Sequence, residues 1–468
     1  MNASAAANKM GTLAGVAKDV GGDLHGPDKP YHSVSTDTRT IGPGQLFFAL
    51  RGERFDAADF VADAAARGAA GAVVEKLAEA DLSQVRVGDS RLALGALARS
   101  WRQNFSIPLI GMTGSNGKTT VKELTAAIMR AHFAEAGDDV VLATQGNLNN
   151  DIGVPLTLLG LRDYHQAGVI EMGANHPGDI AVLADIAQVN VAIITNAARA
   201  HLEGFGSIEE VAQTKGEILD SLGANDTAVL NRDDRFFEQW VARIGNAKLN
   251  SFGMSPEADF QAENVRWVSH TDHATFEFDM RTPLGEIGIS LPLAGRHNVM
   301  NALAAAAATT AAGATLEQVR NGLAGTRNVA GRLRAFRCAR GAMIYDDSYN
   351  ANPDSVAAAI AFLEDLPGEP WLVLGDMGEL GPDAAALHRS MGELAHSAGI
   401  RELFCVGELS RETAAGFGRG ARWFESIESL GEALLPELQE GRNVLIKASR
   451  FMELDRLVRQ IEAAGGEG

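Results

Sequence analysis

The sequence has 468 residues, a formal net charge of -19, 46% hydrophobic residues and 22% charged residues. These values predict a soluble globular protein of roughly two to four domains, at about 100–200 residues per domain. The acidic balance argues against a nucleic-acid-binding protein, whose surface needs a basic face. No apolar run approaches the roughly 20 residues of a membrane span, so we expect no membrane insertion.

Cysteine usage and the N-terminal segment both indicate the cytoplasm. The chain has two cysteines, Cys338 and Cys405, which could form at most one disulfide. One disulfide is too few to hold together a chain of this length, and such sparse use of cysteine fits a reducing compartment. Residues 1–11 lack the apolar core of a secretory signal. We therefore expect a cytoplasmic protein, and we expect it to be a monomer.

The first region, residues 1–105, alternates short apolar runs with helical patterns. Gln45–Leu50 and Ala70–Val74 predict strands, whereas Phe60–Arg67 and Leu92–Asn104 predict helices. We interpret this region as one small α/β domain.

The second region, residues 106–327, has the alternation of strands and helices that is typical of a parallel sheet. It opens with the apolar strand Ile107–Gly111, a glycine-rich turn and a helical pattern over Thr119–Phe133. Thr275–Met280 and Glu286–Leu291 alternate apolar and polar residues, which predicts an antiparallel hairpin appended to the sheet. Four further strands and an Ala-rich helix are predicted: Val140–Ala143, Ala167–Glu171, Val191–Thr195, Ala228–Asn231 and Asn298–Ala311.

The third region, residues 328–468, again alternates strands and helices. The predicted strands are Ala342–Asp346, Trp371–Leu374, Glu402–Val406 and Asn443–Ile446. The sequence therefore predicts an α/β protein of three domains. The central domain is a P-loop ATPase-like parallel sheet with the appended hairpin, and the C-terminal domain is doubly wound.

The most specific local pattern runs from Gly111 to Thr120, between an apolar strand and an amphipathic helix. Glycines let backbone N–H groups turn toward an anion, and the helix N-terminus adds partial positive charge. The lysine of such a loop reaches the β- and γ-phosphates, and a hydroxyl binds Mg²⁺. Met112 replaces the usual first glycine, and the alternative is a turn that binds no ligand. The predicted nucleotide-binding residues are Thr113, Gly114, Ser115, Asn116, Gly117, Lys118, Thr119 and Thr120.

A series of further segments follows the loop in a fixed order. They are NLNNDIGVPLTLL (147–159), EMGA (171–174), NAARAHLEGF (196–205), TKGE (214–217), GRHNVMNAL (295–303), Gly331-Arg332, DDSYNANPDS (346–355), GDMGELG (375–381) and KASR (447–450). With the loop TGSNGKTT (113–120), this series resembles the Mur ligases over nearly the whole chain. Within that family, NLNNDIGVPLTLL and YNANP are most similar to the member that adds D-alanyl-D-alanine. The Asp-Asn-Pro-Arg motif of the member that adds the third residue is absent from the sequence.

The resemblance implies ATP and two Mg²⁺ ions as cofactors. Glu171 and His201 would bind Mg²⁺ with Thr119, and Lys215 would be carbamylated by CO₂ to give a carboxylate-like ligand for the second ion. Together with Lys118 and Arg332, these are the predicted catalytic residues. Without the resemblance, each residue has a commoner role: Glu171 would be a strand-end surface charge, His201 a polar loop residue and Lys215 a solvated lysine on a helix face.

The resemblance also implies contacts to the nucleotide outside the loop. Asn298 and Asn301 would bind the adenine edge, although a helix-capping role is an alternative. Arg332 would pair with the γ-phosphate, where a guanidinium stabilises developing charge. Asp347 would bind the ribose hydroxyls.

The implied substrates are UDP-N-acetylmuramoyl-tripeptide and D-alanyl-D-alanine. Thr38 and Arg39 of the first domain (1–105) would lie near the UDP group, and a polar turn is the alternative. Three asparagines, Asn147, Asn149 and Asn150, would face the muramyl tripeptide, although at least one could instead hold a turn. The dipeptide would bind the C-terminal domain at Tyr349, Asn350, Asn352, Ser449 and Arg450.

The chemistry implied by the resemblance is amide-bond formation through an acyl phosphate. Because the predicted groups fall on two domains, we expect closure of the third domain over the central ATP-binding domain before reaction. Three alternatives remain: a sibling ligase that adds the third residue, a folylpolyglutamate-type ligase, and a nucleotide-binding module that ligates nothing.

Overall fold

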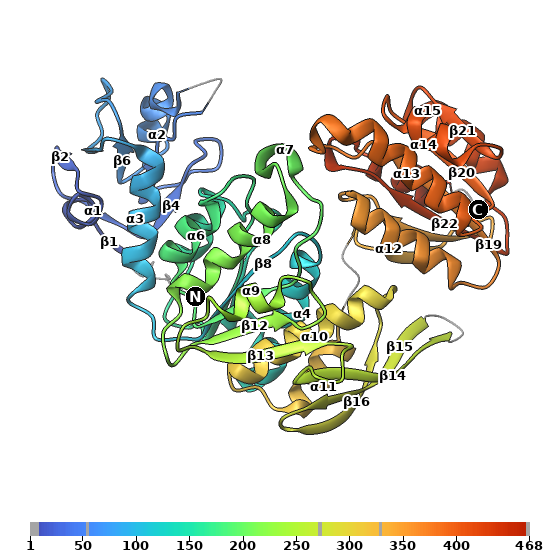
Figure 1. Cartoon of the computed structure of the whole chain (residues 1–468). Coiled ribbons are helices and arrows are strands. Elements are labelled where there is room, and N and C mark those ends of the chain that lie inside the picture. Colours follow the sequence, from blue (N-terminus) through green and yellow to red (C-terminus); the bar gives the residue numbers. More distant parts are fainter. Residues whose placement is uncertain (1–8, 53–55, 270–273, 327–329, 465–468) are drawn as a thin grey trace, which may run out of the picture.

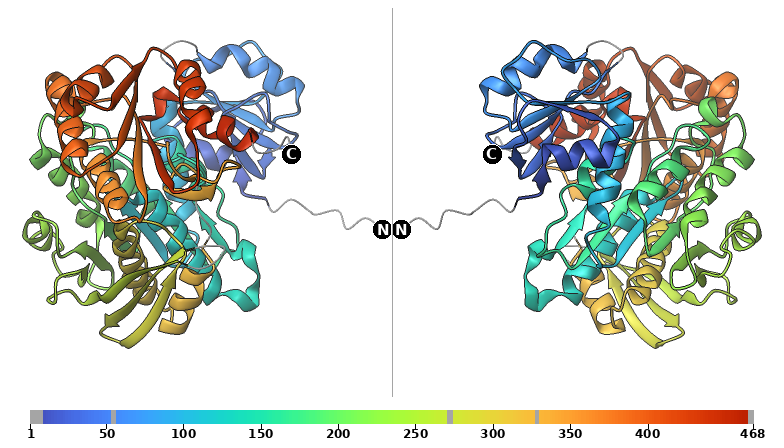
Figure 2. Two further views of the ribbon diagram at one scale, coloured as in Figure 1. Left: turned by 90° about the vertical axis from the view of Figure 1, so that its right-hand side faces the viewer. Right: turned by 90° about the vertical axis from the view of Figure 1, so that its left-hand side faces the viewer.

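The computed structural model describes residues 9–52, 56–269, 274–326 and 330–464, which form three α/β units around three large sheets (Figure 1). The predicted boundary between residues 327 and 328 lies outside the described residues. In Figures 1 and 2 the first unit (blue) and the third unit (orange to red) both lie above the central one. The predicted three-domain α/β architecture is confirmed.

The first unit is a five-stranded sheet in the order β2-β7-β6-β5-β4. Its strands are β2 (Asp23–His25), β4 (Ser33–Ser35), β5 (Gln45–Phe48), β6 (Gly71–Val74) and β7 (Gln84–Arg86), and a small pair, β1 (Gly11–Thr12) and β3 (Pro30–Tyr31), lies beside it. The helices are α1 (Leu13–Val20), α2 (Val61–Ala66) and α3 (Ser90–Arg102). Helix α3 packs onto the central unit, where a Cβ atom on Gly95 would come within 2.9 Å of Ile186. One hydrophobic core therefore runs through both units.

The central sheet has nine strands in the order β16-β15-β14-β13-β12-β11-β8-β10-β9. The strands are β8 (Leu109–Thr113), β9 (Val141–Ala143), β10 (Ala167–Glu171), β11 (Val191–Ile194), β12 (Thr227–Asn231), β13 (Lys248–Gly253), β14 (Phe260–Ser269), β15 (Ala274–Thr282) and β16 (Gly285–Leu291). Strand β8 pairs in parallel with β10 on one side and β11 on the other. The chain thus changes direction along the sheet at β8, where open α/β sheets bind ligands at the carboxyl ends of the strands.

Helices cover both faces of this sheet. One core packs α4 (Lys118–His132), α10 (Arg296–Ala311) and α11 (Leu316–Ala324) against it. The opposite face carries α5 (Gly153–Leu158), α6 (Asp179–Ala187), α8 (Ile208–Gly216) and α9 (Phe237–Val241), and the short α7 (Leu202–Phe205) precedes α8. This double cover explains why the central strands read as continuous apolar runs in the sequence.

The predicted hairpin is confirmed as β15 and β16, but the sequence analysis missed two strands next to it. Strand β14 pairs in parallel with β13 and antiparallel with β15, so the appendage has three antiparallel strands. Strand β13 has the polar sequence KLNSFG, and its Ser251 amide donates to the Asp259 carboxylate at 2.8 Å. The polar residues of β13 hide the apolar pattern that predicts a strand.

The third unit has a six-stranded sheet in the order β17-β18-β22-β19-β20-β21, parallel except for β17. The strands are β17 (Arg334–Arg337), β18 (Met343–Asp347), β19 (Glu369–Gly375), β20 (Glu402–Val406), β21 (Ala421–Phe424) and β22 (Arg442–Lys447). Helices α12 (Pro353–Glu364), α13 (Ala384–Ser397) and α14 (Ser410–Phe417) cover one face, and α15 (Ile427–Leu434) and α16 (Asp455–Ala463) cover the other. The doubly wound prediction is confirmed, although edge strands β17 and β21 were missed.

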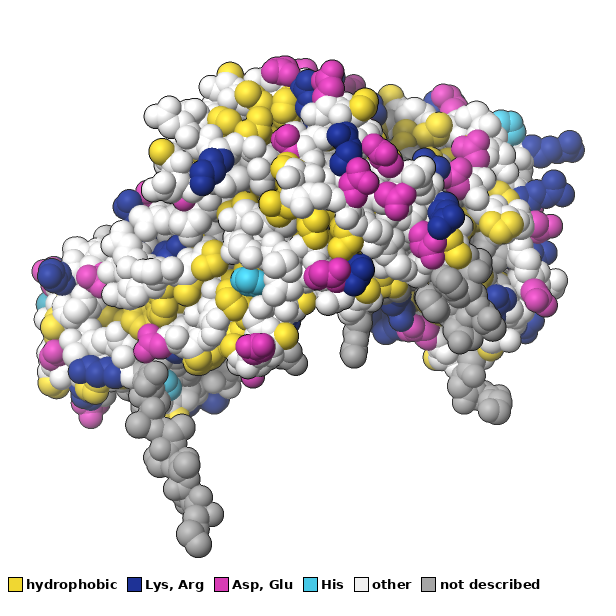
Figure 3. Space-filling model, turned by 90° about the horizontal axis from the view of Figure 1, so that it is seen from below, with side chains coloured by type: hydrophobic (Ala, Val, Ile, Leu, Met, Phe, Trp, Pro, Cys, Tyr) yellow, Lys and Arg dark blue, Asp and Glu magenta, His cyan; other side chains and the backbone are white. Residues whose placement is uncertain are grey.

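The surface carries both signs of charge. On the face drawn in Figure 3, Lys and Arg side chains are interspersed with Asp and Glu, and hydrophobic side chains lie between them. In the part of the chain that the structure describes, no helix combines the length and apolar character that crossing a membrane requires.

Candidate nucleotide and metal site

The glycine-rich loop (residues 114–117), which we call the phosphate loop, joins β8 to α4 at the carboxyl edge of the central sheet. Gly114 and Gly117 have φ angles of +146° and +83°. A Cβ atom on Gly114 would lie 1.9 Å from Thr195 Oγ1, and one on Gly117 would lie 2.5 Å from Asn301 Oδ1. The two positions therefore require glycine, both for backbone conformation and for space.

Two residues at the end of the neighbouring strand β11 hold the loop in place. Thr195 Oγ1 donates to the Asn116 carbonyl at 2.7 Å. Asn196 Oδ1 accepts from the Asn116 amide at 3.0 Å, and its Nδ2 donates to the Asn116 carbonyl at 3.1 Å. The sequence analysis gave neither residue a role, although both follow directly on a buried strand.

Lys118, the first residue of α4, lies among the charged groups of the site. Its Nζ donates to the carbonyls of Gly114 at 2.6 Å and Ser115 at 3.3 Å. Burial lowers the pKa of Lys118, the Glu171 carboxylate opposes this shift, and Arg332 adds to it. A desolvated cation with a second cation nearby is strongly stabilised by an anion, so the loop favours a phosphate ligand.

Arg332 reaches the same loop from the third unit. Its Nη2 donates to Thr119 Oγ1 at 3.3 Å, and its guanidinium lies 4.1 Å from the centroid of the Tyr349 ring. Arg450 lies over the same ring, 5.7 Å from its centroid. Arg332 thus connects Thr119, at the start of α4, with the Tyr349 ring of the third unit.

Glu171 ends β10 and is 2% exposed, so the alternative of a solvated surface charge is wrong. Asn149 Nδ2 donates to its Oε1 at 2.8 Å. Its Oε2 is buried and has no hydrogen-bond partner among the described residues. A buried carboxylate oxygen costs free energy unless it is paired, and here one oxygen is oriented while the other stays open for a ligand.

Lys215 lies in α8 and is 1% exposed, which excludes the alternative of a solvated helix face. Its Nζ is 5.3 Å from the centroid of the Phe205 ring. Burial, reinforced by Lys118, lowers the pKa of Lys215 to about 7, against smaller opposing effects of Asp179 and Glu217. At neutral pH, a large fraction of this amine is therefore uncharged and nucleophilic.

His201 lies in the loop after β11 and contacts the third unit. Its Nδ1 is hydrogen-bonded to Glu379 Oε2, and this bond lowers the pKa of the Glu379 carboxyl group. Glu379 belongs to the segment GDMGELG, to which the sequence analysis gave no role. Both residues have left-handed backbones, with φ angles of +55° and +60°.

The residues present fit a Mg²⁺ ion that is shared with a bound nucleotide. Within the described ranges, no three His, Cys, Asp or Glu side chains are close enough together to hold a metal ion by themselves. Magnesium, however, uses one or two carboxylates and completes its shell with waters and substrate phosphates. The unpaired Oε2 of Glu171 and the hydroxyl oxygen of Thr119 are oxygen ligands that suit Mg²⁺.

The predicted adenine contacts, Asn298 and Asn301, are buried near the start of α10 and bond to each other. Asn301 Nδ2 donates to Asn298 Oδ1 at 2.8 Å, and Asn298 Nδ2 donates to the Ala294 carbonyl at 2.6 Å. The N-cap of this helix is Gly295, so neither asparagine caps it.

The residues predicted to bind ribose and dipeptide lie together at the carboxyl edge of the third sheet. Asp347 forms an ion pair with Lys447 at 2.6 Å. Ser449 Oγ donates to the Ala351 carbonyl at 3.1 Å and accepts from the Gly378 amide at 2.8 Å. These side chains are therefore engaged within the protein.

The two asparagines of this edge also have protein partners. Asn352 caps α12 through the Ser355 amide at 2.9 Å, and its Nδ2 donates to Asn116 Oδ1 of the phosphate loop at 2.8 Å. Asn350 Oδ1 accepts from the Ala351 amide at 2.9 Å. Asn352 therefore connects the third unit directly to the phosphate loop.

The predicted UDP residues lie in an exposed turn of the first unit. Arg39 is 87% exposed and pairs with Asp37 at 2.6 Å, and this bond lowers the pKa of Asp37 to about 2. Thr38 is half-buried between them. The turn presents a fixed guanidinium to solvent.

The three asparagines predicted to face the tripeptide have different roles in the structure. Asn147 is exposed, whereas Asn149 orients Glu171 as described above. Asn150 Oδ1 accepts from the Gly153 amide at 2.9 Å, so it holds the turn before α5. The alternative that one of them holds a turn is confirmed for Asn150.

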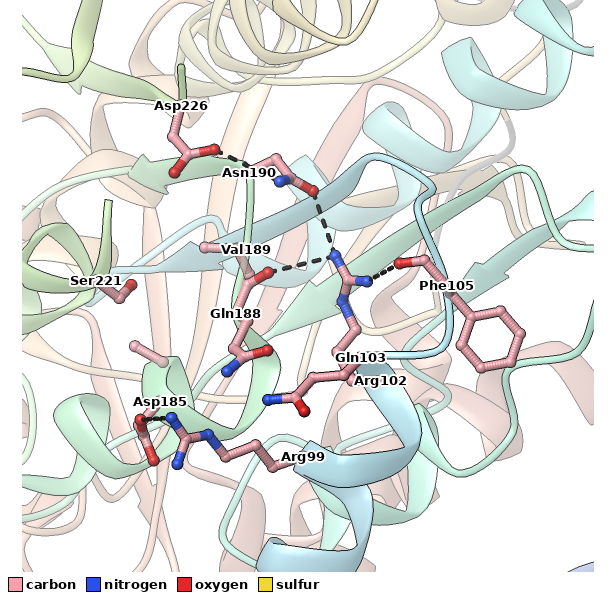
Figure 4. Close-up of a pocket in the computed structure, with 11 residues that line it drawn as sticks. Arg99, Arg102, Gln103, Phe105, Asp185, Gln188, Val189, Asn190, Ser221 and Asp226 are labelled. Carbon is pink, nitrogen blue, oxygen red and sulfur yellow. Dashed lines mark hydrogen bonds and ion pairs between the residues drawn. The ribbon is translucent and has the colours of Figure 1, made fainter. Parts of the chain in front are cut away.

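A pocket of about 560 Å³ lies elsewhere, at the amino ends of the central strands. Figure 4 shows its polar groups paired with one another: Arg102 bonds to the carbonyls of Phe105 and Gln188 and to Asn190, and Arg99 pairs with Asp185. The predicted site residues lie at the opposite edge of the sheet, so this pocket is separate from them.

Comparison with known proteins agrees with the motifs. Residues 30–102 match the Mur ligase family catalytic domain, residues 112–309 the Mur ligase middle domain, and residues 331–450 the Mur ligase glutamate ligase domain. The chain is 42% identical to the UDP-N-acetylmuramoyl-tripeptide--D-alanyl-D-alanine ligase of Escherichia coli K12, covering 97% of this chain and 99% of the relative. This chain belongs to the Mur ligase family.

Solved Mur ligase structures have the same fold. A MurF crystal structure from Acinetobacter baumannii superposes with a TM-score of 0.90 at 32% identity, over 97% of this chain and 99% of the other. MurF from Thermotoga maritima, solved in complex with ADP, gives 0.81 at 27% identity, over 92% and 97% of the two chains. The fold of this chain is thus that of the ATP-dependent Mur ligases.

Proposed function

We propose that this chain joins D-alanyl-D-alanine to UDP-N-acetylmuramoyl-tripeptide at the expense of ATP. The product is the UDP-N-acetylmuramoyl-pentapeptide used in peptidoglycan synthesis, and the reaction takes place in the cytoplasm. The observation that carries the proposal is the pair of buried charged groups, Glu171 and Lys215, close to the half-buried Lys118 of the phosphate loop, in a chain of which 97% matches this ligase.

The tripeptide carboxylate attacks the γ-phosphorus of ATP, which forms an acyl phosphate and releases ADP. The uncharged amine of the dipeptide then attacks the acyl carbon, and the tetrahedral intermediate loses inorganic phosphate and the extra proton on nitrogen to give the amide. Lys118 and Arg332 neutralise charge on the transferring phosphoryl group, so catalysis rests on position and electrostatics. The protein needs no covalent nucleophile for these steps.

Glu171, Thr119 and His201 would hold Mg²⁺ beside the phosphates, and the metal supplies charge neutralisation there. Lys215 would carry a carbamate and hold a second ion. Its burial and its pKa of about 7 support this role, because carbamylation requires an uncharged amine. Asn298 and Asn301 would face adenine, and Asp347 the ribose.

We assign the substrates to the three domains by the boundaries expected from the sequence. Residues 1–105 would bind the UDP end through Thr38 and Arg39, and residues 106–327 would bind ATP, with Asn147, Asn149 and Asn150 toward the tripeptide. Residues 328–468 would bind the dipeptide. Ligand binding there would release Tyr349, Asn350, Asn352 and Arg450 from their present partners, whereas Ser449 would keep its hydrogen bonds to Ala351 and Gly378 and hold the dipeptide site in shape.

The decisive experiment measures phosphate release from ATP with UDP-N-acetylmuramoyl-tripeptide, with and without D-alanyl-D-alanine, and identifies the product by mass. Dipeptide-dependent release with a pentapeptide product is expected. Release that depends on a free amino acid instead would identify a sibling ligase, and the absence of release would leave only nucleotide binding.

A second experiment tests the carbamate on Lys215. After exchange with ¹³CO₂, the protein should show one ¹³C carbamate resonance that the Lys215→Met variant lacks. Full activity of that variant would eliminate the carbamate from the mechanism.

A further inference from the structure

The contact between His201 and Glu379 joins two different units of the molecule. His201 lies in the loop between β11 and α7 of the central unit, and Glu379 lies in the loop after β19 of the third unit. The Glu379 carboxylate bonds to His201 Nδ1, and the Glu379 carbonyl accepts from the Glu203 amide at 3.1 Å. One residue of the third unit therefore holds this loop at two points.

The bond selects which nitrogen of the imidazole is free. An ionised carboxylate only accepts hydrogen bonds, so Nδ1 carries the proton when it bonds to Glu379. In the neutral ring, the lone pair then lies on Nε2, which is the form that can bind a metal ion. Histidine ligands of metals commonly donate their other N–H to a carboxylate, which fixes both tautomer and ring orientation.

The local backbone is built around this contact. Both residues have left-handed φ angles, and the left-handed region is uncommon for a residue such as glutamate. The His201 carbonyl accepts from the amides of Gly204 at 3.0 Å and Phe205 at 3.1 Å, which fixes the turn into α7. The two loops thus present their side chains to each other from fixed turns.

We infer that Glu379 is a positioning residue: it orients His201 from the third unit, so that the metal site of the central unit is complete only when the two units are docked. This inference rests on the proposed function, because it takes His201 as a metal-binding group. It adds a physical reason for docking, since the carboxylate that prepares the ligand comes from the other unit.

A neighbouring contact provides a matched control. Asp354, also in the third unit, accepts from the Arg199 amide at 2.6 Å and from Arg199 Nη2 at 2.9 Å. Asp354→Asn removes the charge of one contact between the same two units, two residues away from His201, while the Asn352–Asn116 contact still holds the units together and the imidazole is untouched. A residue that only tethers the units would behave like Asp354, whereas a positioning residue would not.

The test measures Mn²⁺ binding by electron paramagnetic resonance in the full chain with a non-hydrolysable ATP analogue, so it needs neither peptide substrate. Glu379→Ala should weaken Mn²⁺ binding about 10–100-fold, the usual effect of removing the carboxylate behind a histidine ligand. Glu379→Gln, whose amide oxygen can still accept from Nδ1, should recover part of the loss, and Asp354→Asn should bind Mn²⁺ as the wild type does.

Nitrogen-15 spectra of the metal-free protein give a second readout. The His201 resonance, assigned with a His201→Gln variant, should indicate protonated Nδ1 in the wild type and shift toward protonated Nε2 in Glu379→Ala. Unchanged Mn²⁺ binding and an unchanged tautomer in Glu379→Ala would overturn the inference, as would equal losses in Glu379→Ala and Asp354→Asn. Failure of the ligase assay alone would count against the proposed function and not against this contact.

Discussion

The carboxyl edges of the central and third sheets carry most of the predicted site residues. The two edges differ in how far these side chains are paired with other groups of the protein. At the central edge, buried groups lack a full set of protein partners: Glu171 Oε2 is unpaired among the described residues, and Lys215 contacts an aromatic ring. At the third edge, Asp347, Ser449 and Asn352 are all hydrogen-bonded within the protein.

This difference indicates which edge is preorganised to bind a ligand. Buried charged groups without partners destabilise the folded protein, and they cluster at functional sites, where a bound ligand supplies the missing interactions. At the edge of the third sheet, the polar groups instead form hydrogen bonds within their own unit and with the phosphate loop. We expect substitutions at the central edge to affect catalysis first, and those at the third edge to affect stability first.

The largest effect is expected from Lys118. Lys118→Met removes the cation that we propose to face the phosphates and should lower kcat roughly 100- to 1000-fold. Phosphate release measures the loss. Lys248, an exposed lysine at the start of β13, provides the control, and Lys248→Met should leave the rate unchanged. A small effect of Lys118→Met would remove the loop lysine from the reaction.

Glu171→Gln should have the next largest effect, because it retains the shape of the side chain but loses the charge that we propose to bind Mg²⁺. We expect kcat to fall roughly 100-fold at a Mg²⁺ concentration that saturates the wild type. Raising Mg²⁺ should recover part of the rate. Asn149→Ala, which removes the donor to Oε1, should show a weaker form of the same Mg²⁺ dependence; a loss that Mg²⁺ never relieves would contradict a metal role.

Lys215 allows a test of stability that does not depend on activity. Because burial lowers its pKa from 10.5 to about 7, the folded protein lacks this proton between those pH values while the unfolded chain holds it. Stability therefore falls as pH falls across this window, by about 1.4 kcal/mol per pH unit. Lys215→Met removes this dependence, so its Tm advantage over the wild type should grow from pH 9.5 to 7 in CO₂-free buffer. A constant Tm difference would indicate a charged, paired lysine.

Whether a strand could be predicted from the sequence depends on how deeply it is buried. The central strands β8, β10 and β11 are buried on both faces, so their apolar runs identify them in the sequence. Strands β17 and β21 are partly exposed and polar at the sheet edges, where apolar periodicity is weak. Helix ends differ from prediction by one or two residues because caps, not periodicity, set them.

The site was predictable where one local segment builds it. The phosphate loop needs glycines, a lysine and hydroxyls at adjacent positions, so its sequence nearly determines its shape. Thr195, Asn196 and Glu379 were missed because each acts on a segment distant in the chain: Thr195 and Asn196 on Asn116, and Glu379 on His201. Only the arrangement of β11 beside β8, and of the third unit against the central one, brings these pairs together.

The smallest effect is expected at Ser449, and it separates the two edges most directly. Its buried hydroxyl joins the Ala351 carbonyl to the Gly378 amide, so Ser449→Ala leaves two polar groups unpaired and should cost about 1–3 kcal/mol. The Tm should then fall by about 2–4 °C per kcal/mol, with KM for the dipeptide nearly unchanged. Ser410, another buried serine of this unit, donates to Asp376 at 2.6 Å, and Ser410→Ala should lower Tm similarly. If Ser449→Ala instead raised KM for the dipeptide and left Tm unchanged, Ser449 would contact substrate, and the third edge would be as open to ligands as the central one.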